Sequence, residues 1–297
     1  MTMPRPDLTV GIPVYNGERY LRECLEGIAG QTFGNFRAII GDNCSTDATE
    51  EIARSFIAQD SRFEYVRHAA NMGGARNSND LLGRCESTWF KWAYHDDRCD
   101  ADLFASSMQV LSRSEDTVLA YPRVRLIDGD GVVVGAHDDG ELNLADDRVD
   151  VRVAVLLRRV VTQVQFGIMR TDAVRASGGT SLSVGGEMVL PLGMALRGRL
   201  GVVAESFAYI RQHEGRHGGH RRSEMAWVNP GRRGTAFPYA RSSFVMLAAV
   251  RSAPLTAGER RRCIGALLRN WTIPQWRMVA GDLVRLPFDV GLVGGRS

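Results

Sequence analysis

Residues 88–97 read Thr-Trp-Phe-Lys-Trp-Ala-Tyr-His-Asp-Asp, a bulky and mostly apolar run that ends in two carboxylates. The run predicts a strand over residues 88–95. Ligands of α/β sheets bind outside the carboxyl ends of the strands, so Asp96 and Asp97 would lie where a ligand binds. Carboxylate oxygens also suit a hard divalent cation. This stretch therefore predicts a sheet edge that holds a metal ion on a diphosphate.

Strands and helices alternate through the first 112 residues. Further β-rich runs cover residues 8–15, 36–40 and 62–68, and helical patterns cover residues 21–28, 45–58, 73–85 and 101–112. In the second of these helices, Ser45 or Thr46 is the expected N-cap. Such alternation predicts a mostly parallel sheet with helices on both faces. The loops that follow the strands would share one edge, and they carry Asn16, Asp42, Asn71 and the acidic pair.

The pattern changes in the second part of the chain. Residues 118–127 and 132–135 flank Asp128-Gly-Asp-Gly131, which predicts an antiparallel hairpin. Helical patterns at 146–160 and 187–197 surround an expected strand at 165–169, and a last strand leads from residue 202 to residues 211–213. Residues 214–237 are rich in Gly, Arg and His, which predicts a mobile loop before a helical tail. We therefore expect an α/β fold with a mostly parallel sheet, a small antiparallel addition and a C-terminal helical tail, divided into residues 1–213 and 214–297.

Composition narrows the class of protein. Hydrophobic residues make up 44% of the 297 residues, enough for a sizeable core. The five cysteines form no CxxC pair, which argues against a disulfide framework or structural zinc and for a reducing compartment. No stretch approaches the ~20 apolar residues of a membrane span, so a cytoplasmic protein is expected, with contact at a membrane surface left open.

Charge is distributed unevenly along the chain. Residues 1–196 carry 20 basic and 28 acidic groups, and residues 197–297 carry 17 and 6, so the two parts have net charges of −8 and +11. The basic part could face phosphate or an anionic surface. Its aromatic and basic residues are not interleaved as in a recognisable nucleic-acid module, so no nucleic-acid partner is expected.

Four short motifs occur in order in the first hundred residues. They are Val10-Gly-Ile-Pro-Val-Tyr-Asn16 with Glu18, Gly41-Asp-Asn-Cys-Ser-Thr-Asp47, Asn71-Met-Gly-Gly-Ala-Arg-Asn77 and His95-Asp-Asp97. Together they resemble the family 2 glycosyltransferases of the GT-A fold, over about residues 8–213. The resemblance implies an inverting enzyme that moves a sugar from a nucleotide-diphosphate sugar to an acceptor hydroxyl. Many relatives have Asp-x-Asp-Asp at the last motif, and this chain has Tyr94 at the first aspartate position.

The resemblance also implies roles for individual residues. Donor binding falls to Pro13, Tyr15, Glu18, Asp42, Arg76, Asp96 and Arg211. Among these, Asp42 would accept a hydrogen bond from the base, Asp96 would lie near the ribose, and Arg76 would face the diphosphate. Asp97, and His213 of an Arg-x-His pattern, would ligate a divalent metal, Mn²⁺ or Mg²⁺, that stabilises the leaving diphosphate. Glu187, ahead of an expected helix, matches the place of the general base.

Other functions remain open at this point. A nucleotidyltransferase-like enzyme would share acidic metal ligands, but no glycine-rich triphosphate loop with a lysine is present. A non-catalytic nucleotide-sugar-binding protein would share the fold. His213-Glu-Gly-Arg-His217 also has the HExxH pattern of zinc proteases, although Gly215 and its neighbours disfavour the helix that this pattern requires.

The acceptor and the tail stay undetermined by the sequence. The acceptor could be a glycan, a lipid-linked molecule or a small molecule. The tail, with Trp271, Trp276, Arg269 and Arg277, could form a subunit interface of a homo-oligomer, a lid on the acceptor or a membrane-surface element. Ordinary helix packing explains its tryptophans equally well.

Overall fold

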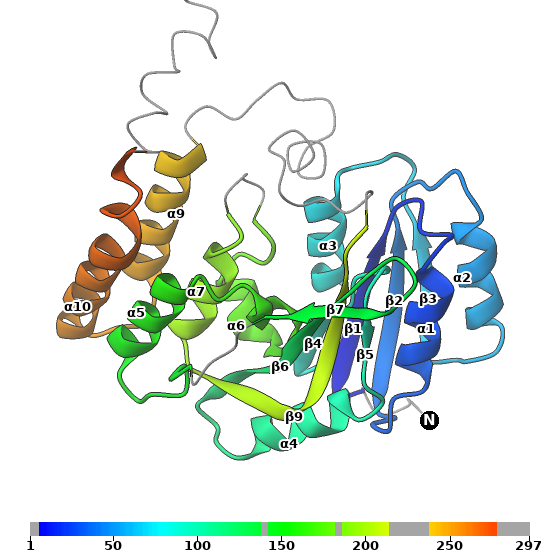
Figure 1. Ribbon diagram of the computed structural model, residues 1–297, viewed down its shortest axis with the longest axis horizontal. Helices are drawn as coiled ribbons and strands as arrows, with labels where there is room; N and C mark the ends of the chain where they lie inside the picture. Colours follow the sequence, from blue (N-terminus) through cyan, green and yellow to red (C-terminus); the bar gives the residue numbers. More distant parts are fainter. Residues whose placement is uncertain (1–5, 138–141, 182–185, 214–237, 278–297) are drawn as a thin grey trace, which may run out of the picture.

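The computed structural model describes residues 6–137, 142–181, 186–213 and 238–277 (Figure 1). The expected loop at 214–237, and His217 within it, lie outside these ranges. The first half of the sheet contains the parallel strands β1 (Leu8–Val14), β2 (Phe36–Asp42), β3 (Phe63–Arg67) and β4 (Trp89–Trp92), in the order β3-β2-β1-β4. They are connected by α1 (Leu21–Ala29), α2 (Thr49–Ile57) and α3 (Gly74–Gly83). The expected alternation is confirmed here.

The second half continues the same sheet with mixed directions. Its strands are β5 (Arg98–Cys99), β6 (Thr117–Ile127), β7 (Val133–Ala136), β8 (Ile168–Arg170) and β9 (Arg199–Arg211). Strand β8 lies antiparallel between β4 and β6, β9 is parallel to β6, and β5 is antiparallel to β9. The hairpin predicted around residues 128–131 is the antiparallel pair of β6 and β7. The sheet thus has a parallel half and an addition with antiparallel strand pairs, as expected.

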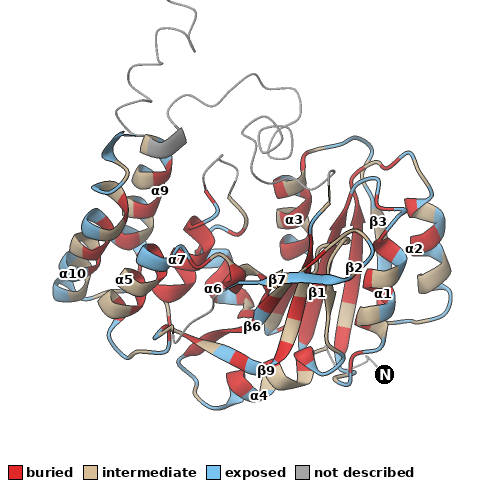
Figure 2. Cartoon of the chain, in the orientation of Figure 1, coloured by how far each residue is buried: buried red, intermediate tan, exposed pale blue. Residues whose placement is uncertain are grey.

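Helices cover both faces of this sheet. Besides α1 to α3, the described residues form α4 (Leu103–Ser112), α5 (Val149–Arg159), α6 (Thr171–Ala176), α7 (Val189–Ala195), α9 (Pro238–Ser252) and α10 (Ala257–Leu267). Short η1 (Gln163–Phe166) and η2 (Leu268–Thr272) segments are 3₁₀ and π helix. Buried residues of α1, α2 and α4 form one core cluster with β1 and β2, and those of α5, α6 and α7 form another that includes β4 (Figure 2).

The helical tail shares the second of these clusters. Met246 and Val250 of α9, Cys263 of α10 and Trp271 of η2 are buried in the same cluster as Trp92 of β4. In Figure 1, α9 and α10 lie beside α5 and α7 at the end of the molecule away from α2. The division at residue 213 stays a prediction. The tail helices share one hydrophobic core cluster with residues that precede position 213.

Some local expectations were wrong for identifiable reasons. The strand expected at 165–169 is a 3₁₀ turn over Gln163–Phe166 followed by β8 from Ile168. Neither Ser45 nor Thr46 is the N-cap of α2, because the helix begins at Thr49 with Ala48 as N-cap. The side chains of the intervening loop instead bond to the loop after β1, a tertiary contact that the local sequence does not announce.

Candidate functional site

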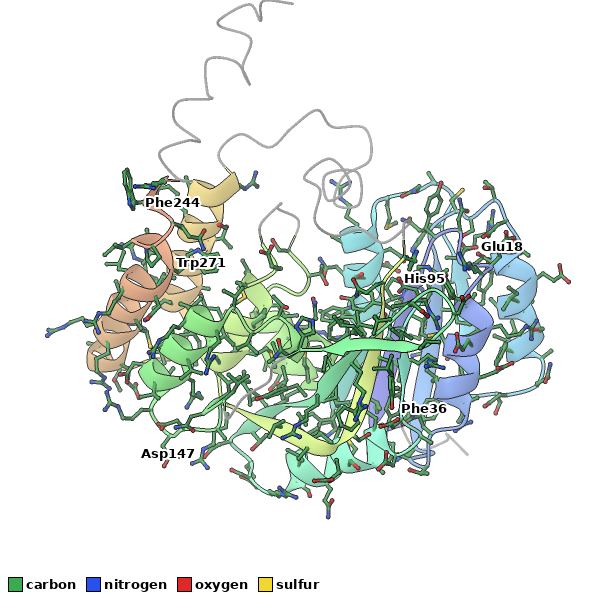
Figure 3. The ribbon with its side chains drawn as sticks, in the orientation of Figure 1. Glu18, Phe36, His95, Asp147, Phe244 and Trp271 are labelled. Atoms are coloured by element: carbon green, nitrogen blue, oxygen red, sulfur yellow. The ribbon has the colours of Figure 1, made fainter. Side chains whose placement is uncertain are left out.

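The parallel register brings the loops of the first motifs to one edge of the sheet. Val14 pairs with Asp42, and Asp42 pairs with Arg67 on β3. In Figure 3, the labelled Glu18 and His95 lie at this edge, whereas Phe36, at the start of β2, lies at the opposite edge. Tyr15 comes directly after β1 and its side chain is 44% exposed. The carboxyl edge therefore presents an accessible aromatic ring next to the end of β2.

Asp42 is entirely buried at this edge. Its Oδ1 accepts the N–H of Ser45 at 2.8 Å. Its Oδ2 accepts the hydroxyl of Tyr65 at 2.6 Å and Nη1 of Arg67 at 3.0 Å. Burial, and then the bond to Asp42, raise the pKa of Tyr65 to about 12. Three donors thus fix the position of the carboxyl group.

Reciprocal hydrogen bonds join the loops after β1 and β2. Ser45 Oγ accepts the N–H of Asn16 at 2.9 Å, and Asn16 Oδ1 accepts the N–H of Thr46 at 2.9 Å. The N–H of Glu18 donates to Asp47 at 3.0 Å, and the Glu18 carboxylate accepts the N–H of Ala48 at 3.1 Å. Glu18 was expected among the donor-binding residues. Its carboxylate accepts a backbone N–H at the start of α2, and its negative charge interacts favourably with the positive end of the helix dipole.

The loop before α3 joins the same edge. Asn43 donates to Asn71 Oδ1 at 2.8 Å and accepts the N–H of Met72 at 2.9 Å. Gly73, just before α3, has a φ of 90°, a backbone conformation that favours glycine. Arg76 follows in the first turn of α3 and is exposed. The third motif thus lies beside the second, with its arginine at the surface.

The acidic pair meets the end of β9. Asp97 Oδ1 accepts the backbone N–H of Arg211 at 3.0 Å, and Nε of Arg211 donates to the Asp96 carbonyl at 2.9 Å. Nε2 of His213 lies 3.1 Å from Asp96 Oδ2. The structure therefore brings together two groups of predicted site residues that are far apart in sequence. One is Asp96 with Asp97, and the other is Arg211 with His213. Arg211 is buried and its side chain contacts protein atoms.

These residues offer suitable ligands for a divalent cation, but they do not complete a cage. Among the described residues, no group of three or more His, Cys, Asp or Glu side chains converges to hold a metal ion. A histidine that binds a metal commonly donates its other ring N–H to a carboxylate, and His213 with Asp96 is such a pair. Mg²⁺ and similar ions are often bound by one or two carboxylates plus substrate phosphates. The donor set of Asp97 and His213 fits a cation that shares its ligands with a diphosphate.

Tyr94 and His95, the two residues before the acidic pair, pack against different elements. The Tyr94 ring packs edge-on against Phe166, with centroids 5.8 Å apart. A Cβ built on Gly17 would lie 2.8 Å from Cδ2 of His95, so the imidazole lies against the loop after β1. Where many relatives have the first aspartate, this chain thus has an aromatic ring in a partly apolar environment.

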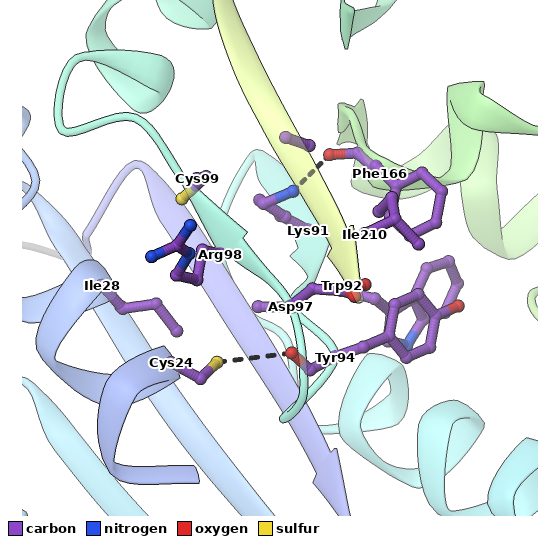
Figure 4. A pocket seen from close by; sticks show the side chains of 12 residues that line it. Cys24, Ile28, Lys91, Trp92, Tyr94, Asp97, Arg98, Cys99, Phe166 and Ile210 are labelled. Atoms are coloured by element: carbon purple, nitrogen blue, oxygen red, sulfur yellow. Dashed lines mark hydrogen bonds between the residues drawn. The ribbon is translucent and has the colours of Figure 1, made fainter. Parts of the chain in front are cut away.

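A small cavity of about 30 Å³ lies behind Asp97 and contains the only lysine of the chain (Figure 4). Lys91 is 4% exposed, and its Nζ donates to the carbonyl of Phe166. Cys24, Cys99 and Asp97 line the same cavity. Burial lowers the pKa of Lys91. Its place within the mostly apolar run of residues 88–95 was the available sequence signal of this burial.

Glu187 is the residue expected to act as the general base. It is exposed and comes two residues before α7. Residues 182–185, which precede it, lie outside the described ranges. Its role as base therefore stays a prediction. Two further residues, Tyr65 and Arg67, were missed by the sequence analysis, although a charged residue at the end of β3 would have pointed to the neighbouring β2.

Comparisons with known proteins agree with this geometry. Residues 9–150 match the model of the family described as "Glycosyl transferase family 2". The chain is 40% identical over 79 residues to "Glycosyltransferase GlyA" of Streptococcus pneumoniae, covering 26% of this chain and 11% of that protein. It is 28% identical over 117 residues to "Putative glycosyltransferase EpsH" of Bacillus subtilis, covering 39% and 34%. The chain thus spans at most about a third of the length of these curated relatives.

Solved structures share the fold at low identity. The structure of Staphylococcus aureus TarS 1-349 in complex with UDP-GlcNAc matches with a TM-score of 0.67 and 16% identity, over 92% of this chain and 75% of that chain. The mannosyltransferase PcManGT from Pyrobaculum calidifontis, in complex with GDP-Man and Mn²⁺, matches with a TM-score of 0.52 and 14% identity, over 95% and 86%. These likenesses confirm the expected GT-A-like fold. The comparisons lead to one conclusion: residues 9–150 match glycosyl transferase family 2, in a chain whose fold is GT-A-like.

Proposed function

We propose that this chain is an inverting glycosyltransferase that transfers a sugar from a nucleoside-diphosphate sugar to a hydroxyl of an acceptor. The observation that carries the proposal is the meeting, at one sheet edge, of the exposed Tyr15, the buried Asp42 and the acidic pair of Asp96 and Asp97. Family membership supports the same reaction class. Related folds bind UDP-GlcNAc, UDP and GDP-Man, which supports a nucleotide-sugar donor here.

In this proposal the donor lies along the carboxyl edge. Tyr15 stacks on the base, since an exposed aromatic ring offers a flat apolar face. Asp42 accepts an N–H of the base once one of its present donors makes room, because the residue has no exposed surface. Pro13, paired in register with Gly41, shapes the floor. Arg76 carries a positive charge that suits the diphosphate. Asp96 is assigned to the ribose.

The chemistry needs a base and a stabilised leaving group. The acceptor oxygen attacks the anomeric carbon and forms the new C–O bond while the bond from that carbon to the diphosphate breaks. Glu187 takes the proton of the acceptor hydroxyl, and the bond electrons leave with the nucleoside diphosphate. Attack from the opposite side inverts the anomeric configuration.

A divalent cation, Mn²⁺ or Mg²⁺, belongs to the same proposal. Asp97 and His213 would hold it, and when bound it supplies positive charge to the departing diphosphate. The mannosyltransferase of similar fold that was solved with Mn²⁺ supports metal use in proteins of this kind. The acceptor in this proposal is a glycan, a lipid-linked molecule or a small molecule with a free hydroxyl.

The tail supports a further part of the proposal, contact with an anionic membrane surface. In the described part of the chain, no helix is long and apolar enough to span a membrane. Residues 238–277 contain seven arginines and one acidic residue, and Ile273 and Trp276 are 62% and 59% exposed. Cosedimentation with vesicles of anionic lipid at low salt, lost in Trp276→Ala, would support this contact. Absence of cosedimentation by the full chain would remove it.

Calorimetric titration tests the main proposal. The purified chain is titrated with UDP, GDP and dTDP, each with Mn²⁺, with Mg²⁺ and with chelator. We expect one nucleotide to bind in a metal-dependent way and Asp97→Ala to abolish that dependence. Asp116→Ala, which removes an exposed carboxylate whose side chain is 76% accessible, is the matched control. No binding of any nucleotide would favour a non-catalytic protein of the same fold.

A further inference from the structure

Arg211 is buried to a degree that is unusual for an arginine. It ends β9 and is 1% exposed. Removing a guanidinium from water is costly unless acceptors replace the water. Nη1 donates to the carbonyls of Asp128 and Gly129 at 3.2 and 3.1 Å, and Nη2 donates to a carboxylate oxygen of Glu23. The charged end of Arg211 is thus solvated by protein atoms.

Residue 211 also holds both members of the acidic pair. Its side-chain Nε donates to the Asp96 carbonyl at 2.9 Å, and its backbone N–H donates to Asp97 Oδ1 at 3.0 Å. One bond therefore fixes the peptide between the two aspartates, and the other fixes a carboxylate oxygen. The orientation of Asp97 is consequently tied to the position of Arg211.

Glu23 supplies the negative charge for this arrangement. It projects from α1, and its second oxygen accepts Nη1 of Arg98 at 3.0 Å. Arg98 in turn donates to the carbonyl of Gly131 at 3.0 Å. Glu23 therefore joins two arginines that both hold the turn between β6 and β7. Its side chain is 41% accessible and belongs to none of the sequence motifs.

The turn at residues 128–131 closes over Arg211. Asp128 Oδ1 accepts the N–H groups of Asp130 and Val132 at 3.0 and 2.9 Å, which stabilises the turn. Gly131 has a φ of 86°. This geometry directs the carbonyls of residues 128, 129 and 131 toward the two arginines. The turn sequence predicted for a hairpin thus also provides acceptors for a buried cation.

We propose that Arg211 and Glu23 form a positioning pair that fixes Asp96 and Asp97 for metal and donor. Arg211 acts through the acidic pair, because its guanidinium is directed to the protein, and not as a ligand of the diphosphate. Glu23 keeps Arg211 in place by neutralising its charge. The consequence for nucleotide binding rests on the proposed function, whereas the effect on the backbone of the acidic pair does not.

Two measurements on the full chain test this pair. The first is hydrogen exchange, read by mass spectrometry on peptides that cover residues 94–99 and 128–131. Glu23→Gln keeps the shape of the side chain and removes its charge, so we expect exchange in these peptides to be at least tenfold faster, with unchanged exchange in β1 and β2. The second is the Mn²⁺ concentration that half-saturates nucleotide binding. We expect this concentration to rise at least tenfold in Glu23→Gln, and we expect excess Mn²⁺ to restore nucleotide binding.

A matched control is available on the parallel half of the sheet. Arg37 and Glu64 form another arginine–glutamate pair, with side chains 30% and 46% accessible, away from the acidic pair in sequence. Glu64→Gln should leave both measurements within twofold of wild type. Glu23→Asp keeps the charge on a shorter side chain, so its exchange rates and Mn²⁺ dependence should lie between those of wild type and Glu23→Gln. This variant also tests the pair if Glu23→Gln folds poorly.

The outcomes separate this inference from the proposed function. If Glu23→Gln matches Glu64→Gln in both measurements, the positioning pair is wrong. If Arg211→Gln abolishes nucleotide binding even at saturating Mn²⁺ while exchange at residues 94–99 is unchanged, Arg211 touches the donor directly and the inference is overturned. If wild type binds no nucleotide, the proposed function fails, and the exchange measurement alone still decides whether the pair holds Asp96 and Asp97.

Discussion

The hydroxyl of Tyr65 donates a 2.6 Å hydrogen bond to Oδ2 of Asp42, linking β3 to the end of β2 beneath the expected base-binding position. Asp42 has no exposed surface, so water does not replace this donor. Hydrogen bonds to a buried charged acceptor contribute more than neutral ones. Tyr65 is therefore part of the support for Asp42.

Tyr65→Phe should lower the free energy of unfolding by roughly 1.5 to 3 kcal/mol, because an ionised, buried acceptor loses a donor. Urea unfolding measures this change. Tyr20→Phe is the control: in the described part of the chain, its buried hydroxyl has no hydrogen-bond partner. Its removal should cost less than about 0.5 kcal/mol. Equal losses in the two variants would contradict the support that Tyr65 gives to Asp42.

Glu187→Gln should reduce kcat by at least ~100-fold, because the amide cannot accept the proton of the acceptor hydroxyl. Nucleotide affinity should stay within twofold of wild type. The measurement is steady-state transfer with the donor that calorimetry identifies. Glu205→Gln, at an exposed position on β9, should keep normal turnover. Near-normal turnover of Glu187→Gln would remove Glu187 as the base.

Lys91 should resist amine-reactive reagents in the folded chain, because it is 4% exposed and donates to the Phe166 carbonyl. As the only lysine, it gives an unambiguous readout by mass spectrometry. We expect labelling at Lys91 only on unfolding. Arg158→Lys places a lysine at an exposed position of α5 and should be labelled at once. Rapid labelling of Lys91 in the native chain would contradict its burial.

Lys91→Arg should be destabilising even though it keeps the charge. The adjoining cavity measures about 30 Å³, roughly the share of one water molecule, and a guanidinium is larger and planar. Overpacking of this kind typically costs about 1–3 kcal/mol. Urea unfolding of the variant gives the value, and unchanged stability would show that the cavity adapts.

Alkaline pH should destabilise the chain partly through Cys263. Burial raises the pKa of this thiol from 9.0 to about 11, and its side chain has no exposed surface. Above pH 9 the unfolded chain releases this proton while the folded chain keeps it, so the stability that is fully present below pH 9 falls until about pH 11. The difference in unfolding free energy between wild type and Cys263→Ala should shrink by roughly 2 kcal/mol from pH 8 to pH 11 in reductant. A constant difference would contradict the raised pKa.

Much of the fold was predictable because it depends on local periodicity. The alternation of apolar strands with amphipathic helices predicted β1 to β4 and their helices, and Asp128-Gly-Asp-Gly131 predicted the hairpin of β6 and β7. Errors arose where a distant contact outweighed a local preference. The start of α2 is the clearest example, since the N-cap Ala48 has no side-chain cap bond and its N–H donates to the Glu18 carboxylate, 30 residues away.

The sequence by itself determined which chemistry gathers at the carboxyl edge. Strand β4 ends at Trp92 and leads into Asp96 and Asp97, which places them at that edge of a parallel sheet, because strand direction fixes where the following loop lies. Only the tertiary structure decided how they are held. Arg211 reaches Glu23 across 188 positions of sequence and Asp96 across 115, and no local pattern encodes such pairs. A buried charge takes the acceptors that packing brings to it, so its partners depend on the whole fold.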